Sequence, residues 1–373
     1  MNDRLNQFSL WLKENDVDFA FITSPSNVFY LTNFHCTPHE RLLGLAVFPD
    51  AEPFLVCPQM EVSRAREAGW GEEIVSYGDA DDPWEKVRSA FEKRSSANGG
   101  STTAAAIEVS VLSYERAAKL REACRGEADL HFRDAEVKIG ELRRVKDDRE
   151  IGVMRDAAKL ADEAVAVGVE AIAEGKTEME IVAEIEYAMK KRGVSQMAFS
   201  TMVLTGANAA KPHGTPGRTR IKKGDFVLFD LGVVVDGYCS DITRTVAFGK
   251  PNEEQKKVYE TVLRAQEAAL AAGKPGGRIG DLDKIAREII TDAGYGEYFP
   301  HRIGHGLGIE AHEAPSMSEN NDGQLQTGMV YTIEPGIYVP DVVGVRIEDD
   351  VLVTETGYES LTAYPKELQI IQV

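Results

Sequence analysis

The stretch VLFDLGVVVDGYCSDITRT, residues 227–245, carries two aspartates in strand-like sequence. An apolar run leads directly into Asp230, and a second carboxylate, Asp241, follows eleven positions later. A buried carboxylate without a counter-charge costs several kcal/mol or takes up a proton. The stretch therefore predicts a pair of strands whose two carboxylates need a compensating charge inside the protein.

A second pair of strand-like segments has the same feature. GMVYTIEPG (328–336) contains Glu334, and GVRIEDDVLVT (344–354) contains Glu348. Helical periodicity precedes each pair, and the apolar positions are Ile151, Met154, Ala158, Ala161 and Val165 before the first pair and Val258, Val262, Ala265 and Ala269 before the second. We therefore expect two similar helix-then-hairpin units facing each other, which would bring four carboxylates together.

Four converging carboxylates would repel one another strongly at low dielectric, so they need cations. Arg244 and Arg346 are close in sequence, but two arginines cannot match four acids. Two divalent metal ions can. The acids therefore favour a dinuclear metal site.

Histidines in the same half of the chain independently indicate a metal site. His213, His301, His305 and His312 lie in the second half of the chain, the last three within HRIGHGLGIEAHE (301–313). His301 and His305 have the spacing of a helical zinc pair, but the glycines between and after them disfavour a helix and predict a loop. One histidine with four carboxylates favours Mn²⁺, with Co²⁺, Fe²⁺ or Zn²⁺ tolerated.

The N-terminal part has a different pattern. DFAFIT, LGLAVFP, PFLVCP and AAAIEVS are short apolar runs that alternate with helical segments, which predicts an α/β layer. Longer helices follow from about residue 134. A chain of 373 residues exceeds the size of a single core, so we expect two domains, 1–133 and 134–373.

Composition narrows the class of protein. Lysine and arginine total 42 against 61 acidic residues, a net charge of −19, and no dense basic run occurs, which disfavours a nucleic-acid or membrane surface. No apolar run is long enough to span a bilayer, and the N-terminus is charged, so a cytoplasmic protein is expected. The four cysteines lack CxxC spacing, as is typical of reduced thiols.

Two glycine-containing stretches resemble phosphate loops only superficially. EGKTEMEI (174–181) lacks the required glycine at position 170, and Thr177 with Glu180 predicts a capping box that starts a helix instead. GKPGGRIGDLD (273–283) lacks a preceding strand, so we expect a turn with Asp281 as a helix cap.

The blocks FDLGVVVDGYCSDITRT, GHGLGIEAHE, TIEPGIY and GVRIEDD resemble the signatures of the proline-specific metallopeptidases, the Xaa-Pro dipeptidases (prolidases) and aminopeptidase P. The order and spacing of five family ligands match Asp230, Asp241, His305, Glu334 and Glu348. SPSNVFYLTNF (24–34) and PHERLL (38–43) resemble the family's N-terminal domain, so the resemblance covers nearly the whole chain.

The resemblance implies an α/β (α+β) protein with a small creatinase-like N-terminal domain and a pita-bread catalytic domain with pseudo-two-fold halves, usually dimeric. It implies two metal ions held by the five ligands, Asp241 and Glu348 bridging both and His305 binding one. His213 and His312 would act near the scissile bond, Glu334 would also carry protons, His301 would line the pocket, and Arg346 would orient ligands or substrate.

The implied activity is metal-dependent hydrolysis of Xaa-Pro bonds in dipeptides or short peptides. Dipeptidase and aminopeptidase P both remain open, as does a non-catalytic binding protein, although such relatives have lost ligands. Methionine aminopeptidase normally lacks so large an N-terminal domain, and creatine amidinohydrolase lacks these ligands. His35 and His39, in FHCTPHER (34–41), are either surface loop residues or contribute to a partner subunit's active site.

Overall fold

The computed structural model describes residues 3–98, 103–124 and 130–372 and divides the chain into two compact units, Met1–Arg143 and Arg144–Val373. The division falls at the end of α6 (Glu136–Arg144), whereas the sequence analysis placed it before this helix, after residue 133. Ile139 of α6 is fully buried, and Nη1 of Arg143 donates to Oδ1 of Asn27 at 2.6 Å. These contacts place α6 with the first unit.

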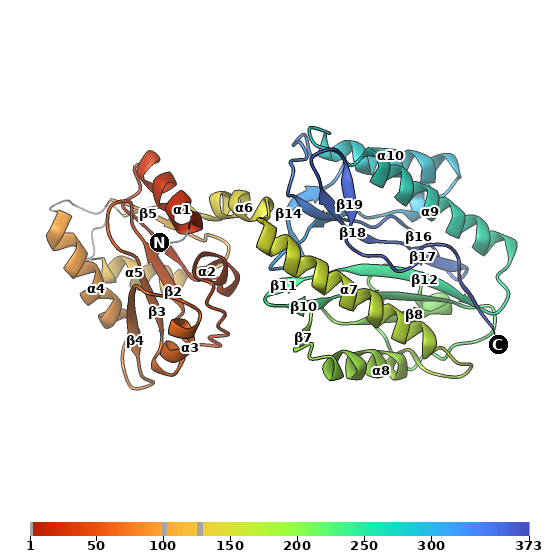
Figure 1. Cartoon of the computed structure of the whole chain (residues 1–373), viewed down its shortest axis with the longest axis horizontal. Helices are drawn as coiled ribbons and strands as arrows, with labels where there is room; N and C mark the ends of the chain where they lie inside the picture. The colour runs from red at the N-terminus through yellow and green to blue at the C-terminus, as the bar shows by residue number, and fades with distance from the viewer. Residues whose placement is uncertain (1–2, 99–102, 125–129, 373) are drawn as a thin grey trace. The chain divides into compact units, whose positions relative to one another are not determined.

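The first unit is a six-stranded sheet in the order β4-β3-β2-β1-β5-β6, with helices around it (Figure 1). Its strands are β1 (Phe19–Ile22), β2 (Gly44–Val47), β3 (Phe54–Pro58), β4 (Glu73–Tyr77), β5 (Ala104–Ile107) and β6 (His131–Asp134). Its other helices are α1 (Asp3–Glu14), α2 (Pro25–Thr32), η1 (Gln59–Glu61), α3 (Val62–Glu67), α4 (Pro83–Asn98) and α5 (Tyr114–Ala123). The pairs β1–β2 and β2–β3 are antiparallel and the others parallel. The α/β layer predicted from the four apolar runs is confirmed.

The second unit contains two helix pairs, each followed by paired strands (Figure 1). The helices are α7 (Asp148–Glu170), α8 (Glu178–Lys191), η2 (Gly206–Asn208), α9 (Glu253–Ala272), α10 (Ile279–Asp292) and η3 (Gly296–Tyr298). The strands of the first half are β7 (Gln196–Met197), β8 (Met202–Thr205), β9 (Phe226–Leu231), β10 (Val233–Val235), β11 (Tyr238–Cys239) and β12 (Ile242–Phe248). Those that follow are β13 (Gly304–Gly306), β14 (Glu313–Met317), β15 (Val330–Ile333), β16 (Gly336–Val339), β17 (Val343–Arg346), β18 (Asp349–Val353), β19 (Tyr358–Ser360) and β20 (Ile370–Ile371).

Each helix pair has its own core against its own strands. The α7–α8 pair packs on β9, β10 and β12, and the α9–α10 pair packs on β15 to β18. The apolar positions predicted for α7 and α9 are buried, except that Ile151 is only half-buried. The predicted helix-then-hairpin repeat is therefore confirmed.

The two halves meet along β12 and β17. The main-chain N–H of Glu348 donates to the carbonyl of Thr243 at 3.1 Å, and the hydroxyl of Thr245 donates to the carbonyl of Arg346 at 3.0 Å. Asp230 is paired with Thr243 in the β9–β12 ladder, while Glu334 and Glu348 lie where the β15–β18 ladder gives way to the β16–β17 ladder. This junction brings the carboxylates of both halves to one place.

Helix starts agree with the sequence at one predicted position and differ at another. Thr177 and Glu180 form the capping box that begins α8, as predicted. The prediction of Asp281 as a cap is wrong, because α10 begins at Ile279 and its cap position is Arg278. Asp281 lies in the first turn, where its carboxylate pairs with Nη1 of Arg278 at 3.0 Å and suits the helix dipole.

The loop predicted around His305 is instead the short strand β13, paired with β14 and β15. A Cβ on Gly304 would lie 2.0 Å from the carbonyl oxygen of Thr332, and one on Gly306 would lie 2.2 Å from that of Ala314. The glycines thus allow neighbouring backbone to approach closely, and they do not prevent strand pairing. The prediction of a loop at this position is therefore wrong.

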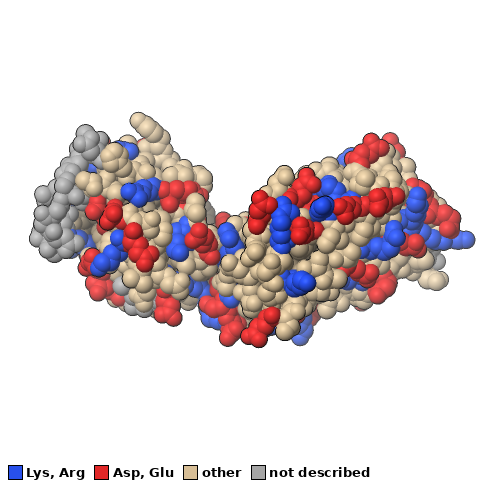
Figure 2. Space-filling view, turned by 90° about the horizontal axis from the view of Figure 1, so that it is seen from above, with Lys and Arg blue, Asp and Glu red and all other residues tan. Residues whose placement is uncertain are grey.

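The surface agrees with the charge pattern of the sequence. Acidic and basic side chains are interspersed on the face shown in Figure 2, without a continuous basic area. Among the described residues, no helix combines the length and the apolar character needed to cross a bilayer.

Candidate metal centre and active site

One cavity of about 690 Å³ in the second unit is lined by every residue that the sequence analysis assigned to the site. These residues are His213, Asp230, Asp241, His301, His305, His312, Glu334, Arg346 and Glu348. Six further residues line the same cavity, namely Phe199, Met202, Pro212, Arg302, Glu310 and Ala311. The structure therefore gathers side chains from both hairpins and from the histidine segment around one space.

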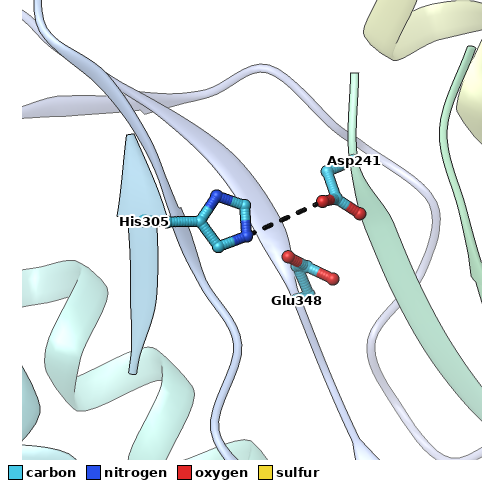
Figure 3. Close-up of side chains that lie close together, drawn as sticks. All are labelled: Asp241, His305 and Glu348. Atoms are coloured by element: carbon cyan, nitrogen blue, oxygen red, sulfur yellow. Dashed lines mark ion pairs between the residues drawn. The ribbon is translucent and has the colours of Figure 1, made fainter. Parts of the chain in front are cut away.

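Three of the five predicted ligands form a compact cluster. Asp241, His305 and Glu348 each offer one ligand atom, and these atoms all lie within 4.8 Å of one another (Figure 3). Nε2 of His305 lies 3.9 Å from Oδ2 of Asp241, and Nδ1 lies 3.1 Å from the carbonyl oxygen of Gly306. When a cation is bound, a proton on Nδ1 would leave the Nε2 lone pair to bind it.

The other two predicted ligands adjoin this cluster. Oε1 of Glu334 lies 3.3 Å from Nε2 of His305, and the main-chain N–H of Glu334 donates to the carbonyl of Ile303 at 2.8 Å. Oδ2 of Asp230 accepts a short hydrogen bond from Nη2 of Arg346. Asp230 is thus held beside the cluster by an arginine.

The electrostatics of the cluster show a deficit of positive charge. Burial, followed by the charges of nearby carboxylates, raises the pKa of Asp241 and Glu348 well above the ordinary range. Burial also raises the pKa of Asp230, although Arg346 opposes this. Burial alone would raise the pKa of Glu334, but its hydrogen bond and charge interaction with His305, with help from Arg346, lower it.

A divalent cation fits these residues. Oδ1 of Asp241 and Oε1 of Glu348 are buried and have no hydrogen-bond partner in the described part of the chain. Buried polar atoms of native proteins are nearly always satisfied, so these two oxygens need a partner. Carboxylate oxygens with one imidazole nitrogen are ligands that a divalent cation accepts, and a cation would also relieve the repulsion among the acids.

A hydrogen-bonded chain connects the predicted ligands to His301 in the cavity wall. The hydroxyl of Thr243 donates to Oε2 of Glu348 at 2.6 Å and accepts from Nε of Arg346 at 3.1 Å. Nη1 of Arg346 donates to the hydroxyl of Tyr338 at 2.8 Å, and that hydroxyl lies 3.0 Å from Nε2 of His301. The donors of Arg346 are directed at protein groups, so this side chain can orient the predicted ligands.

Two histidines face the cluster from the cavity. The ring of His312 lies 4.1 Å from that of His305, and burial, followed by the nearby charge of His305, lowers the pKa of His312. Burial also lowers the pKa of His301. Both imidazoles are therefore favoured in the neutral form, in which each has one donor and one acceptor nitrogen.

The sequence analysis did not identify several residues that support the site. Tyr338 joins Arg346 to His301, Thr243 holds Glu348, and Oδ2 of Asp350 accepts from the main-chain N–H of Asp241 at 3.0 Å. Alternation along a strand was a usable signal for two of them, because Thr243 and Asp350 lie two residues after Asp241 and Glu348. No comparable signal marked Tyr338.

A buried charge network lies behind the ligand strands. Nη2 of Arg244 donates to Oδ1 of Asp349 at 2.7 Å, and Oδ2 of Asp349 accepts from Nζ of Lys366 and Nε2 of Gln266, both at 2.8 Å. Nη1 of Arg244 also donates to the carbonyl of Glu348. Arg244 therefore compensates Asp349 behind the site, as a structural pair that leaves the ligand cluster without its charge.

Comparisons with known proteins show the family of both units. Residues 152–355 match the model of metallopeptidase family M24, and residues 4–145 match that of the creatinase/prolidase N-terminal domain. A Bacillus subtilis protein named putative dipeptidase YkvY is 55% identical, covering 99% of this chain and 100% of its own.

Solved structures of two peptidases are similar to this chain over nearly its whole length. An Xaa-Pro dipeptidase from Bacillus anthracis has a TM-score of 0.89 and 34% identity, covering 99% of each chain. An X-Pro aminopeptidase from Thermotoga maritima has a TM-score of 0.85 and 31% identity, covering 96% of this chain and 98% of its own. The similarity thus extends across both units and includes structures named for either of two related activities.

Proposed function

The chain belongs to metallopeptidase family M24, and from this premise we propose that it is an Xaa-Pro dipeptidase that uses two divalent metal ions, in the first instance Mn²⁺. The observation that carries the proposal is the buried cluster of Asp241, His305 and Glu348, in which two carboxylate oxygens have no hydrogen-bond partner in the described part of the chain and need a cation. Names of relatives supply the substrate class, since both a putative dipeptidase and an Xaa-Pro dipeptidase match along nearly the whole chain.

We assign the metal-binding role to Asp230, Asp241, His305, Glu334 and Glu348. When bound, the ions would supply Lewis acidity, which polarises a carbonyl and makes a water nucleophile available near neutral pH. Mn²⁺ is favoured because the donor set has one imidazole against four carboxylates.

We assign the proton-transfer role to Glu334. The carboxylate form of Glu334 is stabilised beside His305, so it can accept a proton from the attacking water and deliver it to the departing nitrogen. His312 and His213 line the same cavity, where a neutral imidazole can donate to the developing oxyanion or to the leaving group. An Xaa-Pro bond has no N–H, so the site needs no acceptor for that nitrogen.

We propose a cytoplasmic homodimer as the working form. The four cysteines are free thiols, which suits a reducing compartment, and the dimer rests on the resemblance to the family. Light scattering during size-exclusion chromatography measures the mass in solution. A contribution of His39 to a partner's active site would then be tested by substituting that residue in the dimer.

The test of activity uses three substrates and metal-stripped protein. Ala-Pro, Ala-Ala and Ala-Pro-Ala are assayed after chelation and after adding back each of Mn²⁺, Co²⁺, Fe²⁺ and Zn²⁺, with Asp241→Asn protein as the inactive control. We expect hydrolysis of Ala-Pro only with metal, highest with Mn²⁺, and slower hydrolysis of the other two peptides. Protein inert toward Ala-Pro with every metal would refute the proposal.

An X-Pro aminopeptidase is the second candidate, because a structure of that name also matches over nearly the full chain. Faster hydrolysis of Ala-Pro-Ala than of Ala-Pro would favour this activity. Equal loss of both reactions in Asp241→Asn protein would show that one site performs them.

A further inference from the structure

Arg302 is a cation in the active-site cavity that has no acidic partner among the residues that the structure describes. It follows His301 directly, is exposed, and lines the cavity together with the candidate ligands. Its Nη1 donates to the neutral hydroxyl of Ser316 at 3.2 Å, and Arg302 forms no ion pair within the described ranges. In a chain with 61 acidic residues, an arginine left without a carboxylate at this place needs an explanation.

Arg346, the other arginine that lines the cavity, differs from Arg302 in having its charge compensated. Arg346 is buried and directs its donors to Asp230, Tyr338 and Thr243. Its positive charge is therefore matched within the protein. Arg302 has five N–H donors in a planar fork and makes one side-chain hydrogen bond to the described residues, so it keeps donors for a ligand with two acceptor oxygens.

Strand register places the Arg302 guanidinium near the reacting centre. Ser316 is the cross-strand partner of His305 in the β13–β14 ladder, so the two side chains lie on the same face. Directly opposed residues have Cβ atoms about 4.5 to 5.5 Å apart. By bonding to Ser316, the guanidinium is held beside a candidate metal ligand, on the side of the cavity.

A dipeptide substrate carries a negative charge at a fixed short distance from the scissile bond. In an Xaa-Pro dipeptide, the carboxylate is attached to the α-carbon next to the scissile nitrogen. It must therefore enter a cavity whose other charged groups include Glu310 and the acids of the metal cluster. A planar guanidinium matches a carboxylate with two parallel hydrogen bonds and offsets the repulsion from these acids.

We propose that Arg302 binds the free carboxylate of the residue that follows the scissile bond and thereby selects dipeptides over longer peptides. This inference rests on the proposed Xaa-Pro peptidase function and adds to it the residue that binds the C-terminal carboxylate of the substrate. The side chain acts in binding, so it takes no part in proton transfer.

The test compares a substrate with its amide. Ala-Pro and Ala-Pro amide differ only in the charge of the terminal group, and kcat/KM is measured for both with Mn²⁺-loaded wild-type, Arg302→Gln and Arg302→Lys proteins. Arg192→Gln is the matched control, because Arg192 pairs with Glu163 on the surface and is absent from the cavity lining.

We expect the wild-type protein to prefer Ala-Pro over its amide, and Arg192→Gln to keep that preference. In Arg302→Gln, kcat/KM for Ala-Pro should fall roughly 10- to 100-fold, the usual worth of hydrogen bonds to a charged group, mainly through KM. Turnover of the amide should stay within about twofold, which also shows that fold and metal site are intact. For Arg302→Lys, kcat/KM for Ala-Pro should lie between the wild-type and Arg302→Gln values, because lysine keeps the positive charge but lacks the planar guanidinium.

Two results would overturn the inference. If kcat/KM falls equally for both substrates in Arg302→Gln, Arg302 supports the site in general and does not bind the carboxylate. If kcat/KM is unchanged for both, Arg302 has no role in substrate binding. A wild-type protein inactive on both substrates would instead refute the proposed function, and the role of Arg302 with it.

Discussion

The hydroxyl of Thr243 lies 2.6 Å from Oε2 of Glu348, and the main-chain N–H of Glu348 donates to the carbonyl of Thr243 at 3.1 Å. These two contacts join β12 of the first half to the segment before β18 of the second. A candidate metal ligand is thus fixed at the junction by the opposite half. The site therefore depends on how the halves dock as well as on each hairpin.

Thr243→Val should lower metal affinity and activity more than stability. The substitution keeps the shape of the side chain, but it leaves Oε2 of Glu348 and Nε of Arg346 without their shared partner. Groups that orient metal ligands typically contribute about 10- to 100-fold in affinity or activity. We expect a loss of that size in Mn²⁺ affinity, measured by metal titration with activity as the readout.

Thr261→Val is the matched control, because it makes the same substitution at another buried threonine. Thr261 is also buried, but its hydroxyl donates to the carbonyl of Lys257 within α9, away from the cavity. It should alter the unfolding temperature slightly and leave metal affinity unchanged. Equal metal affinity in both variants would contradict the orienting role of Thr243.

Asp241→Asn should abolish hydrolysis and stabilise the metal-free protein. Asp241 is 4% exposed and lies among acids, so the neutral amide removes repulsion that no cation balances after chelation. We expect an increase of about 1 to 3 kcal/mol in the free energy of unfolding in EDTA, on the scale of one buried charge. Urea denaturation with and without metal measures this change.

Asp349→Asn is the matched control, and it should have the opposite effect. Asp349 is equally buried but pairs with Arg244 and Lys366, so neutralising it leaves two cations without their partner. Removing one member of a buried pair costs about 3 to 5 kcal/mol. A stabilising Asp349→Asn, or a destabilising Asp241→Asn in EDTA, would contradict this description of the two acids.

The stability difference between wild-type and Asp241→Asn protein should depend on pH when metal is absent. The pKa of Asp241 is raised in the folded state, so the stability it contributes is present below its unfolded pKa of about 3.9 and is lost as pH rises through the folded pKa. In EDTA the variant's advantage should therefore grow from acidic toward neutral pH. Unfolding temperatures at several pH values between about 4 and 8 measure it.

The pKa of Asp349 is lowered despite its burial, because Arg244 and Lys366 outweigh the loss of hydration. Its stabilising contribution is therefore present above the unfolded pKa and lost as pH falls through the folded pKa. The deficit of Asp349→Asn should stay constant near neutral pH and shrink only in acid. A deficit that grew in acid would contradict the assigned shift.

Four of the candidate ligands could be chosen from the sequence because each lies in a short block with its own signal. Asp230, Asp241, Glu334 and Glu348 interrupt apolar strand sequence, and a charge in such a place requires a reason. The helix-then-hairpin repeat followed from periodicity. These features are local, so one sequence is sufficient to show them.

The residues that the sequence analysis missed depend on contacts between distant segments. Tyr338 bonds to both Arg346 and His301, and Arg302 reaches Ser316 across a ladder. Register and strand approach decide such contacts, and local pattern does not encode them. The short strand at His305 was missed for a similar reason, since glycines that permit close backbone approach also resemble those of a loop.

Arg287 of α10 should set the position of His301. Its Nη1 donates to the carbonyl of Phe299 at 2.9 Å and its Nη2 to that of His301 at 2.8 Å, while Asp283 holds the guanidinium at 2.8 Å. The guanidinium also lies 4.3 Å from the centre of the Phe299 ring. The main chain on both sides of His301 is thereby fixed to a helix.

Arg287→Gln should therefore release His301 and lower kcat/KM for Ala-Pro about tenfold, since misplacing a group in the site by about 1 Å can cost up to 100-fold. Lys284→Gln on the same helix is the control, because Lys284 is exposed and makes only a surface pair with Glu288. Metal content should be unchanged in both variants, because neither residue contacts a candidate ligand in the described part of the chain. If Arg287→Gln lowers the unfolding temperature but leaves kcat and KM at wild-type values, Arg287 supports the fold alone and the positioning role is wrong.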